Sequence, residues 1–383
     1  MSRIALAAAL LFAGFGVGAG FSAYAQQPYD PIYTPASKAV RAEQAALVGF
    51  DQFKDTYITT GVFGTVLMRH GTSDWQQMDI PTSVLLTSVD IIDDDYIWAA
   101  GHDGVLLQST DGGQTWQHRL DGTELLNMEY PWLQARIAEI EAEIDSLEDA
   151  DEIDELEFTL EELGFLMQGL DIQFEVGPTK PFLDVLFLDR STGFALAAYG
   201  TLLKTINGGD SWQILNDRID NPAGYHLNKL LVTDDNILFL LGEYGLLSRS
   251  DDLGESWDAL DTPYDGSFFG GVIDQSGQLW IFGLRGNVFK SADNGESFHA
   301  VNVPTRYNLN NGTVLGDGRL VFVGQSGVIV VIEPSTEQAV VYSHESSVPL
   351  MGVRQGAGNE LILVGRSGLQ SFIIPNGSTG IKG

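Results

Sequence analysis

The chain has 383 residues, a hydrophobic content of 44% and a formal net charge of −32. A surface this acidic repels phosphate backbones and anionic lipid headgroups, which argues against nucleic acid and membrane surfaces as partners. The sequence contains no cysteine, which excludes disulfides, thiol chemistry and a lipid-attachment cysteine.

The N-terminus has the features of an export signal. Arg3 precedes an apolar stretch rich in Ala and Gly, and Ala23-Tyr24-Ala25 forms an A-x-A cleavage site. No stop-transfer pattern comes after it. We therefore expect residues 1–25 to be a cleaved signal peptide and the mature protein to be periplasmic, without direct membrane anchoring. A retained anchor and secretion beyond the envelope are the alternatives.

A G-x-x-G pattern recurs seven times after the Pro- and Tyr-containing segment 26–43, which we expect to be an extended arm. The pairs are Gly61/Gly64, Gly101/Gly104, Ala197/Gly200, Gly242/Gly245, Gly283/Gly286, Gly324/Gly327 and Gly365/Gly368, with Ala in the first place of the third. The second glycines follow one another at intervals of 40, 96, 45, 41, 41 and 41 residues, and the interval of 96 equals one period plus about 55 inserted residues. A period near 40, with an apolar run before each pair, is typical of four-stranded propeller blades. The sequence therefore predicts an all-β fold, a seven-bladed β-propeller over residues 44–375, followed by a tail of residues 376–383.

The seventh blade lacks a predicted fourth strand. An open seam would leave an unpaired strand edge, which is an aggregation hazard. We expect the arm, roughly residues 28–42, to pair there and close the ring. The alternative is a three-stranded last blade.

Residues 121–178 form an insertion after blade two, and they differ from the repeats in charge and periodicity. They hold 18 Asp and Glu but a single basic residue, Arg136, before the return to the propeller. Apolar residues alternate there at spacings of 3 and 4: Leu133, Ile137, Ile140, Ile144 and Leu147, then Ile153, Leu156, Leu160, Leu163 and Met167. This is the pattern of two amphipathic helices. We predict an antiparallel α-helical hairpin of two helices of about 17 residues, with Pro131 in the first turn of the first.

Four repeats continue into a box of the form S-x-D-x-G-x-[TS]-W. The boxes are STDGGQTW (109–116), TINGGDSW (205–212), SDDLGESW (250–257) and SADNGESF (291–298). We expect the Asp, or Asn in the second box, to accept hydrogen bonds from its own turn, the Gly to take a positive φ, and the aromatic to pack between blades. The residues with these structural roles are Asp111, Gly113, Trp116, Asn207, Gly209, Trp212, Asp252, Gly254, Trp257, Asp293, Gly295 and Phe298.

These boxes resemble BNR, or Asp-box, repeats. Joined to the strand that ends in G-x-x-G, they resemble in particular the propeller family related to the photosystem II assembly and stability factor, over about residues 44–375 apart from the insertion. The resemblance implies a periplasmic, non-enzymatic assembly factor. Photosynthetic relatives carry an arginine-rich patch, and no comparable basic cluster stands in this sequence.

The sequence carries no pattern for catalysis or metal binding. Sialidases share the Asp box, but they need an arginine cluster, and the Arg-Ile-Pro motif is absent here. The six histidines show neither H-x-H nor H-E-x-x-H spacing. We expect no enzyme activity, no cofactor and no metal.

Two surfaces are candidates for binding a partner. One is formed by aromatic tips of the G-x-x-G turns, Phe63, Tyr199 and Tyr244. The other is the second predicted helix, where Phe158, Phe165 and Leu166 lie off the apolar seam. The alternatives are structural roles: the tips cover the edge of the core, and the helix residues rest on the propeller or on Trp132.

The hypothesis favoured by the sequence is a scaffold or assembly factor for an envelope membrane-protein complex. The resemblance implies a resistance-nodulation-division (RND) exporter, through its periplasmic part, as the first partner to test. The alternatives are a carbohydrate-active propeller (glycoside hydrolase or lectin) and, in a phototroph, a photosystem II assembly factor.

Overall fold

The computed structural model describes residues 29–376, and the chain divides into two units, Met1–Asp30 and Pro31–Gly383. The expected signal peptide lies outside the described residues, as do residues 377–383 of the expected tail. Only Tyr29 and Asp30 of the first unit are described, and neither is in a helix or strand. The helices and strands among the described residues all belong to the second unit.

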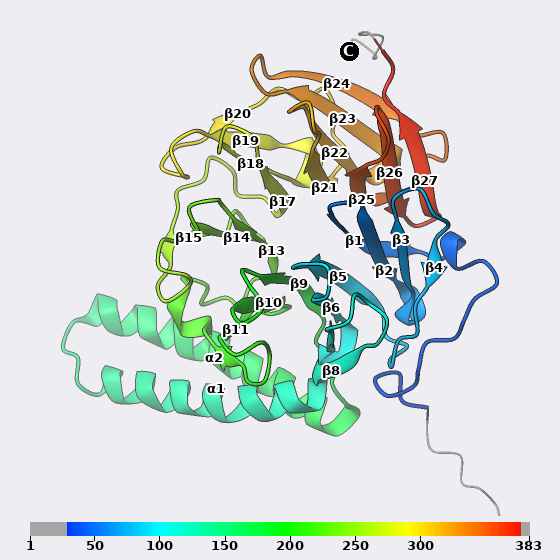
Figure 1. Ribbon diagram of the computed structural model, residues 1–383. Coiled ribbons are helices and arrows are strands. Elements are labelled where there is room, and N and C mark those ends of the chain that lie inside the picture. Colours follow the sequence, from blue (N-terminus) through cyan, green and yellow to red (C-terminus); the bar gives the residue numbers. More distant parts are fainter. Residues whose placement is uncertain (1–28, 377–383) are drawn as a thin grey trace, which may run out of the picture. The chain divides into compact units, whose positions relative to one another are not determined.

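The described part of the second unit contains seven antiparallel sheets, in which sequential strands pair as meanders (Figure 1). Blades one to three are β1–β4 (Leu47–Phe53, Thr56–Gly61, Val66–His70, Gln76–Gln77), β5–β8 (Leu86–Ile91, Ile97–Gly101, Leu106–Ser109, Gln117–Leu120) and β9–β12 (Phe182–Phe187, Gly193–Ala197, Thr201–Thr205, Gln213–Ile214). Blades four and five are β13–β16 (Leu227–Val232, Leu238–Gly242, Leu247–Ser250, Asp258–Ala259) and β17–β20 (Phe268–Ile273, Leu279–Gly283, Val288–Ser291, His299–Ala300). Blades six and seven are β21–β24 (Leu309–Val314, Leu320–Gly324, Val328–Glu333, Gln338–Ser343) and β25–β27 (Leu350–Gln355, Glu360–Gly365, Gly368–Ile373).

The first strands of the blades form a closed ring. Each contacts the first strand of the next blade, and β25 of blade seven contacts β1 of blade one. Figure 1 shows these strands grouped around a common centre, with later strands of each blade farther out. The predicted seven-bladed propeller is therefore confirmed, with an inserted helical hairpin between blades two and three.

The second strands are apolar because neighbouring blades cover both of their faces. Every residue of β6, β14, β18 and β22 is buried. Short helical turns come after several of them, η2 (Val62–Gly64), η3 (His102–Gly104), η5 (Leu284–Gly286) and η6 (Gln325–Gly327), while η1 (Ala42–Gln44) and η4 (Asn216–Arg218) lie elsewhere. Gly64, in η2, has φ +67°, and a Cβ there would lie 2.1 Å from the Thr82 carbonyl oxygen. The recurrent second glycine thus meets both a conformational and a spatial need.

The expected strand pairing of the arm with the last blade is not formed. The sheet β25–β26–β27 has three strands, and residues 29–46 contain only η1 and turns. The arm crosses blades one and two, where Ser83 donates its backbone N–H to the Pro31 carbonyl (2.8 Å) and Ile32 is buried. At its end, η1 contacts β27 of blade seven without pairing as a strand. Pro31 and Pro35 explain the difference, because proline has no N–H to offer a strand partner.

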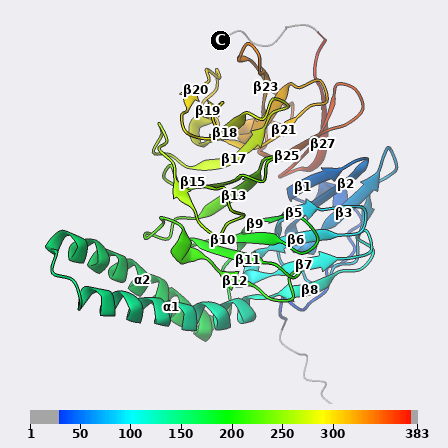
Figure 2. The same cartoon turned by 60° about the vertical axis from the view of Figure 1, so that its left-hand side comes forward.

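The insertion is a hairpin of two long helices, which Figure 2 shows side by side. Helix α1 (Gly122–Ile144) has 23 residues and α2 (Ala150–Val176) has 27, longer than expected. The first helix begins at a capping box of Asp121 with Glu124, so Pro131 lies inside the helix and not in its first turn. The seam between the helices buries Leu126, Leu133, Ile140, Leu163 and Leu170.

Candidate functional site

The Asp-box side chains are used within their own turns. In blade two, the Asp111 carboxylate accepts hydrogen bonds from the backbone N–H of Thr115 (2.8 Å), the Thr115 hydroxyl (2.6 Å) and the Ser109 hydroxyl (2.9 Å). Asp252 and Asp293 make the same three contacts in blades four and five. Asn207 also accepts the N–H of Ser211, at 3.0 Å, in blade three.

These contacts set the ionisation of the Asp-box carboxylates. The hydroxyl of the seventh box residue, followed by its backbone N–H, lowers the pKa of all three aspartates. For Asp252 the pKa falls to about 2. The carboxylates are therefore ionised at neutral pH and engaged by their own loops, which suits a structural role and leaves little for proton transfer.

The glycines and aromatics of the boxes join neighbouring blades. Gly113 has φ +83°, and a Cβ there would lie 2.3 Å from the Met68 sulfur of blade one. Gly209, Gly254 and Gly295 also have positive φ. The aromatic Trp212 packs edge-on against Trp98 of blade two, with ring centroids 5.9 Å apart. The remaining box aromatics, Trp116, Trp257 and Phe298, lie in or against the apolar clusters between blades.

The centre of the ring holds a polar cavity of about 610 Å³. Three of the carboxylates that line it each accept a backbone N–H from the next blade. The pairs are Asp51 with Ile91 (2.9 Å), Asp90 with Phe187 (2.7 Å) and Asp184 with Leu230 (3.1 Å). These carboxylates thus link the first strands of blades one to four.

Two cations complete this central network. Lys229 donates to Asp184 (2.8 Å), and Arg354 of blade seven donates to Asp51 of blade one (3.1 Å), across the seam of the ring. Burial and the nearby charge of Asp51 raise the pKa of Asp90 to about 8, so it holds a proton at neutral pH. Arg354 is the one arginine among the described residues lining the cavity, so the arginine cluster of a sialidase is not assembled there.

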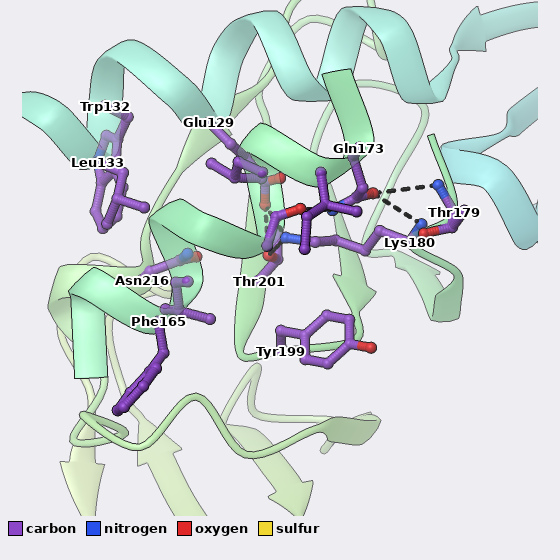
Figure 3. Close-up of a pocket in the computed structure, with 14 residues that line it drawn as sticks. Glu129, Trp132, Leu133, Phe165, Gln173, Thr179, Lys180, Tyr199, Thr201 and Asn216 are labelled. Carbon is purple, nitrogen blue, oxygen red and sulfur yellow. Dashed lines mark hydrogen bonds and ion pairs between the residues drawn. The ribbon is translucent and has the colours of Figure 1, made fainter. Parts of the chain in front are cut away.

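A different pocket, of about 320 Å³, lies between the hairpin and blade three (Figure 3). Its walls are mostly apolar and come from both helices and from the G-x-x-G turn of blade three. They include Trp132, Leu133, Phe165, Leu166, Leu170, Ile172 and Tyr199. We call this space, together with Glu129, Gln173, Lys180 and Thr201 that also line it, the hairpin pocket.

A buried ion pair lines the hairpin pocket. Lys180 Nζ lies 2.6 Å from Glu129 Oε1, and the exposed fractions of the two side chains are 8% and 5%. The Thr201 hydroxyl donates to the same Oε1 at 2.6 Å. The other carboxylate oxygen, Glu129 Oε2, is buried and has no hydrogen-bond partner among the described residues. Because a buried acceptor without a partner costs free energy, a donor that reached this atom would stabilise the site.

A second polar contact fixes the end of the hairpin beside this pair. The Gln173 side-chain oxygen accepts the backbone N–H groups of Thr179 and Lys180, at 3.1 and 3.2 Å. Figure 3 shows these two bonds at one end of the pocket, with the Lys180 side chain extending from there toward Glu129. The last turn of α2 is thereby tied to the segment that enters blade three.

The structure brings together three of the six residues predicted to bind a partner. Phe165, Leu166 and Tyr199 line the hairpin pocket. Tyr244 lies outside it, stacked on Tyr225 with ring centroids 4.6 Å apart. Phe158 on α2 and Phe63 on blade one are exposed and line none of this pocket.

Glu129 and Lys180 were missed by the sequence interpretation. They stand 51 residues apart, and the fold brings them together only because the hairpin returns to blade three. One signal was present: Glu129 lies three residues after Leu126 and four before Leu133, on the apolar stripe of the helix. A charge at such a position needs a partner, which the sequence does not identify.

Neither a metal site nor a membrane-spanning helix occurs in the described part of the chain. In residues 29–376, no group of three or more His, Cys, Asp or Glu side chains is placed to hold a metal ion. No helix in that range is long and apolar enough to cross a membrane.

Comparison with known proteins supports the fold and the family resemblance. The sequence model of the Photosynthesis system II assembly factor YCF48 matches residues 67–140 and 169–266. None of the curated proteins matches the chain in sequence.

Solved propellers match the described architecture over most of its length. A structure of YCF48 bound to D1 peptide has a TM-score of 0.58 at 13% identity and covers 91% of this chain and 99% of that one. YCF48 from Cyanidioschyzon merolae has a TM-score of 0.55 at 14% identity, covering 86% and 95%. A streptogramin B lyase has a TM-score of 0.61 at 11% identity, covering 86% and 93%, so similarity at this level shows the fold alone. The chain is a BNR-type seven-bladed propeller that resembles the photosystem II assembly factor family.

Proposed function

We propose that this protein is a non-catalytic periplasmic propeller that binds and helps to assemble a membrane-protein complex of the cell envelope. The matched family is one of assembly factors, and one structural neighbour is a YCF48 protein bound to a D1 peptide. Two internal features agree with this. The Asp-box carboxylates are engaged within their own turns, and the central carboxylates link successive blades.

The observation that carries the proposal is an acidic hairpin with apolar side chains turned outward. Phe158, Phe165, Ile172 and Phe174 on α2 are between 48% and 58% exposed. Of these, Phe158, Phe165 and Ile172 follow one another at intervals of seven residues and therefore share one face of α2. Exposed apolar side chains gathered on one face are characteristic of protein-binding surfaces. The excess of Asp and Glu in residues 121–178 favours a partner surface that is basic around an apolar centre.

Contacts at its base also fix the hairpin to the rest of the propeller unit. Asp121, the N-cap of α1, accepts a hydrogen bond from the Tyr33 hydroxyl of the arm. Where the chain returns to the propeller, Gln173 ties α2 to the entry of blade three, and the Glu129–Lys180 pair ties α1 to the same segment. A surface that is ordered before binding loses less conformational entropy when the partner docks.

The test is recovery of membrane proteins from detergent-solubilised envelopes by the tagged protein. In one variant, residues 127–172 are replaced by a short linker, which removes most of both helices and leaves the propeller. A matched control, Tyr307→Ser, removes an exposed aromatic residue from the loop between blades five and six, which belongs to neither candidate surface. We expect the hairpin variant to lose the partner and the control to keep it. Equal recovery by all three proteins would contradict a docking role for the hairpin.

For the partner and the compartment, our proposal is more specific. We propose the periplasmic part of an RND exporter as the partner and cleavage of the signal peptide before Gln26. N-terminal sequencing of protein released by osmotic shock tests the compartment, and a chain that still begins at Met1 would contradict it. Reciprocal capture with a tagged exporter tests the partner, and the absence of this protein from the recovered exporter would remove that assignment.

A carbohydrate-active propeller is the second candidate. The observation in its favour is the polar central cavity with Asp51, Asp90 and Asp184. Incubation with a panel of aryl glycosides and glycans decides between the two. Turnover or binding that is abolished by Asp184→Asn would favour this candidate over the scaffold.

A further inference from the structure

We propose that the hairpin pocket receives one aromatic side chain that ends in a neutral hydrogen-bond donor, tryptophan or tyrosine, from a basic segment of the docked protein. This inference rests on the proposed function and specifies the chemistry of the partner. Three observations carry it: the unpartnered Glu129 oxygen, the apolar walls and the charge of the hairpin.

Glu129 Oε2 is the acceptor to which the docked side chain would donate a hydrogen bond. Its sister oxygen, Oε1, already receives Lys180 Nζ and the Thr201 hydroxyl, both at 2.6 Å. Oε2 is closed off from solvent in this structure, so the proposal requires a lining side chain to turn aside before a donor can reach it. A hydrogen bond to a charged acceptor is among the stronger kinds, because one partner is ionised.

The donor of the docked side chain is expected to be neutral, because Lys180 already places a positive charge beside Glu129. Lys180 neutralises Glu129, and a second ammonium or guanidinium group would be repelled by Lys180 in a buried, weakly screened site. The indole N–H and the phenol O–H carry no charge.

The apolar walls of the pocket favour a ligand side chain in which the donor is attached to a wide apolar ring. Trp132, Phe165, Leu166, Leu170 and Tyr199 offer aromatic and aliphatic surfaces, and the volume of about 320 Å³ lies at the small end of the range for ligand pockets. Tryptophan and tyrosine combine a large apolar ring with a polar tip, which is why they anchor many protein interfaces.

The negative charge around the pocket favours basic residues in the rest of the docked segment. Asp171, Glu175 and Glu161 are exposed on α2, the helix that contributes Phe165 and Leu170 to the pocket. A segment with lysine or arginine on either side of the aromatic residue would face these carboxylates. Such exposed pairs contribute mainly to association rate, and the inserted ring contributes most of the affinity.

The first experiment measures binding of lysine-rich peptides with one central tryptophan to the full mature chain, by calorimetry. In a matched peptide the tryptophan is replaced by benzothienylalanine, which keeps the shape of the ring but lacks the N–H. We expect about tenfold or greater weakening from this single change. Equal affinities would overturn the role of Glu129. Binding of free indole as tight as that of the peptide would overturn the assignment to a protein segment.

The second experiment fills the pocket from within. Gly169 lines the pocket, and a Cβ added there meets nothing within 4 Å. Gly169→Trp should therefore fold, occupy the pocket and abolish peptide binding. Gly164→Trp is the matched control, since position 164 is on the same helix, has equally open space and does not line the pocket. Native-like peptide affinity in the Gly169→Trp protein would overturn the proposed location.

The two proposals fail in distinguishable ways. If the linker variant loses the membrane protein while Gly169→Trp recovers it normally, the hairpin docks the partner but the pocket is not where it docks. If the linker variant also recovers it normally, the docking role of the hairpin itself is wrong.

Discussion

At the scale of single residues, two aspartates of the propeller have pKa values that are shifted in opposite directions. Asp252 lies in an exposed turn and is stabilised as an anion by Ser256 and Ser250. Asp90 lies in the central cavity near Asp51, and its environment stabilises the protonated form. Both are structural residues, and their different pKa values predict different responses to pH.

The Asp-box aspartate should be replaceable by asparagine but not by alanine. Asp252→Ala leaves the Ser256 N–H without its acceptor and should lower the free energy of unfolding by roughly 1–2 kcal/mol. Asp252→Asn should cost less, because Asn207 makes the corresponding turn in blade three. Chemical denaturation at pH 7 measures both, and equal losses would contradict the hydrogen-bonding role.

The depressed pKa of Asp252 also predicts an acid-dependent difference. Its folded-state pKa of about 2 lies below the ordinary value of 3.8, so its contribution to stability is fully present above about pH 4 and is lost as the pH falls toward 2. The stability difference between the native protein and Asp252→Asn should therefore shrink over this window. Denaturation between about pH 2 and 5 is the measurement, and a difference independent of pH would contradict it.

For Asp90 the change of stability with pH has the opposite sign. Its pKa is about 8 in the folded protein and near 3.8 when unfolded, so the native state holds an extra proton between these values and loses stability as the pH rises. Asp90→Asn keeps an acceptor for the Phe187 N–H and removes the charge. We expect chemical denaturation to show the variant gaining stability relative to the native protein as the pH rises from about 4 to 8, by an amount on the order of several kcal/mol. A constant difference across that range would contradict the raised pKa.

At the scale of elements, the hairpin depends on one buried ion pair. Replacing Glu129 by Leu or Lys180 by Met leaves the other charge buried and unpaired, which should cost roughly 3–5 kcal/mol. The double variant Glu129→Leu/Lys180→Met removes both charges, and most of the loss should be recovered. Thermal unfolding of the four proteins forms the cycle, and additive losses would mean that the two side chains do not interact.

Local sequence signals predicted the helices and the strands well, and their ends less well. The 3–4 spacing of Leu133, Ile140 and Leu163 indicated the helical seam because it reports a local periodicity. The first helix begins earlier than expected because the capping signal, Asp121 with Glu124, preceded the apolar stripe. The hairpin pocket could not be predicted, since the pairing of Glu129 with Lys180 depends on how the hairpin returns to blade three.

At the scale of the whole propeller unit, contacts between blade seven and blade one near the centre close the ring. Strand β25 packs against β1, and Arg354 reaches Asp51 across the seam. Seven blades could be predicted because each repeat carries its own glycines. The arm reaches blade seven only through the contact of η1 with β27 and adds no strand there. Its packing through Ile32 between blades one and two could not be predicted, because such a long-range contact has no local signature.

The arm offers a matched pair of positions to test this packing. Ile32 is 4% exposed, whereas Val40 on the same arm is fully exposed. Ile32→Ala should lower the free energy of unfolding by roughly 2–4 kcal/mol, and Val40→Ala should change it by less than about 0.5 kcal/mol. Similar small effects at both positions, measured by urea denaturation, would mean that the arm is not part of the folded core.

The central claim, that the hairpin is where a partner docks, is tested most directly by site-specific photo-crosslinking in cells. A photoreactive residue is placed at Phe165, at the hairpin pocket, or at Leu253, in the Asp box of blade four; both side chains are exposed, at 58% and 40%. We predict a defined adduct with one membrane protein from position 165 and none from position 253. Adducts from position 253 alone, or from neither position, would contradict the claim.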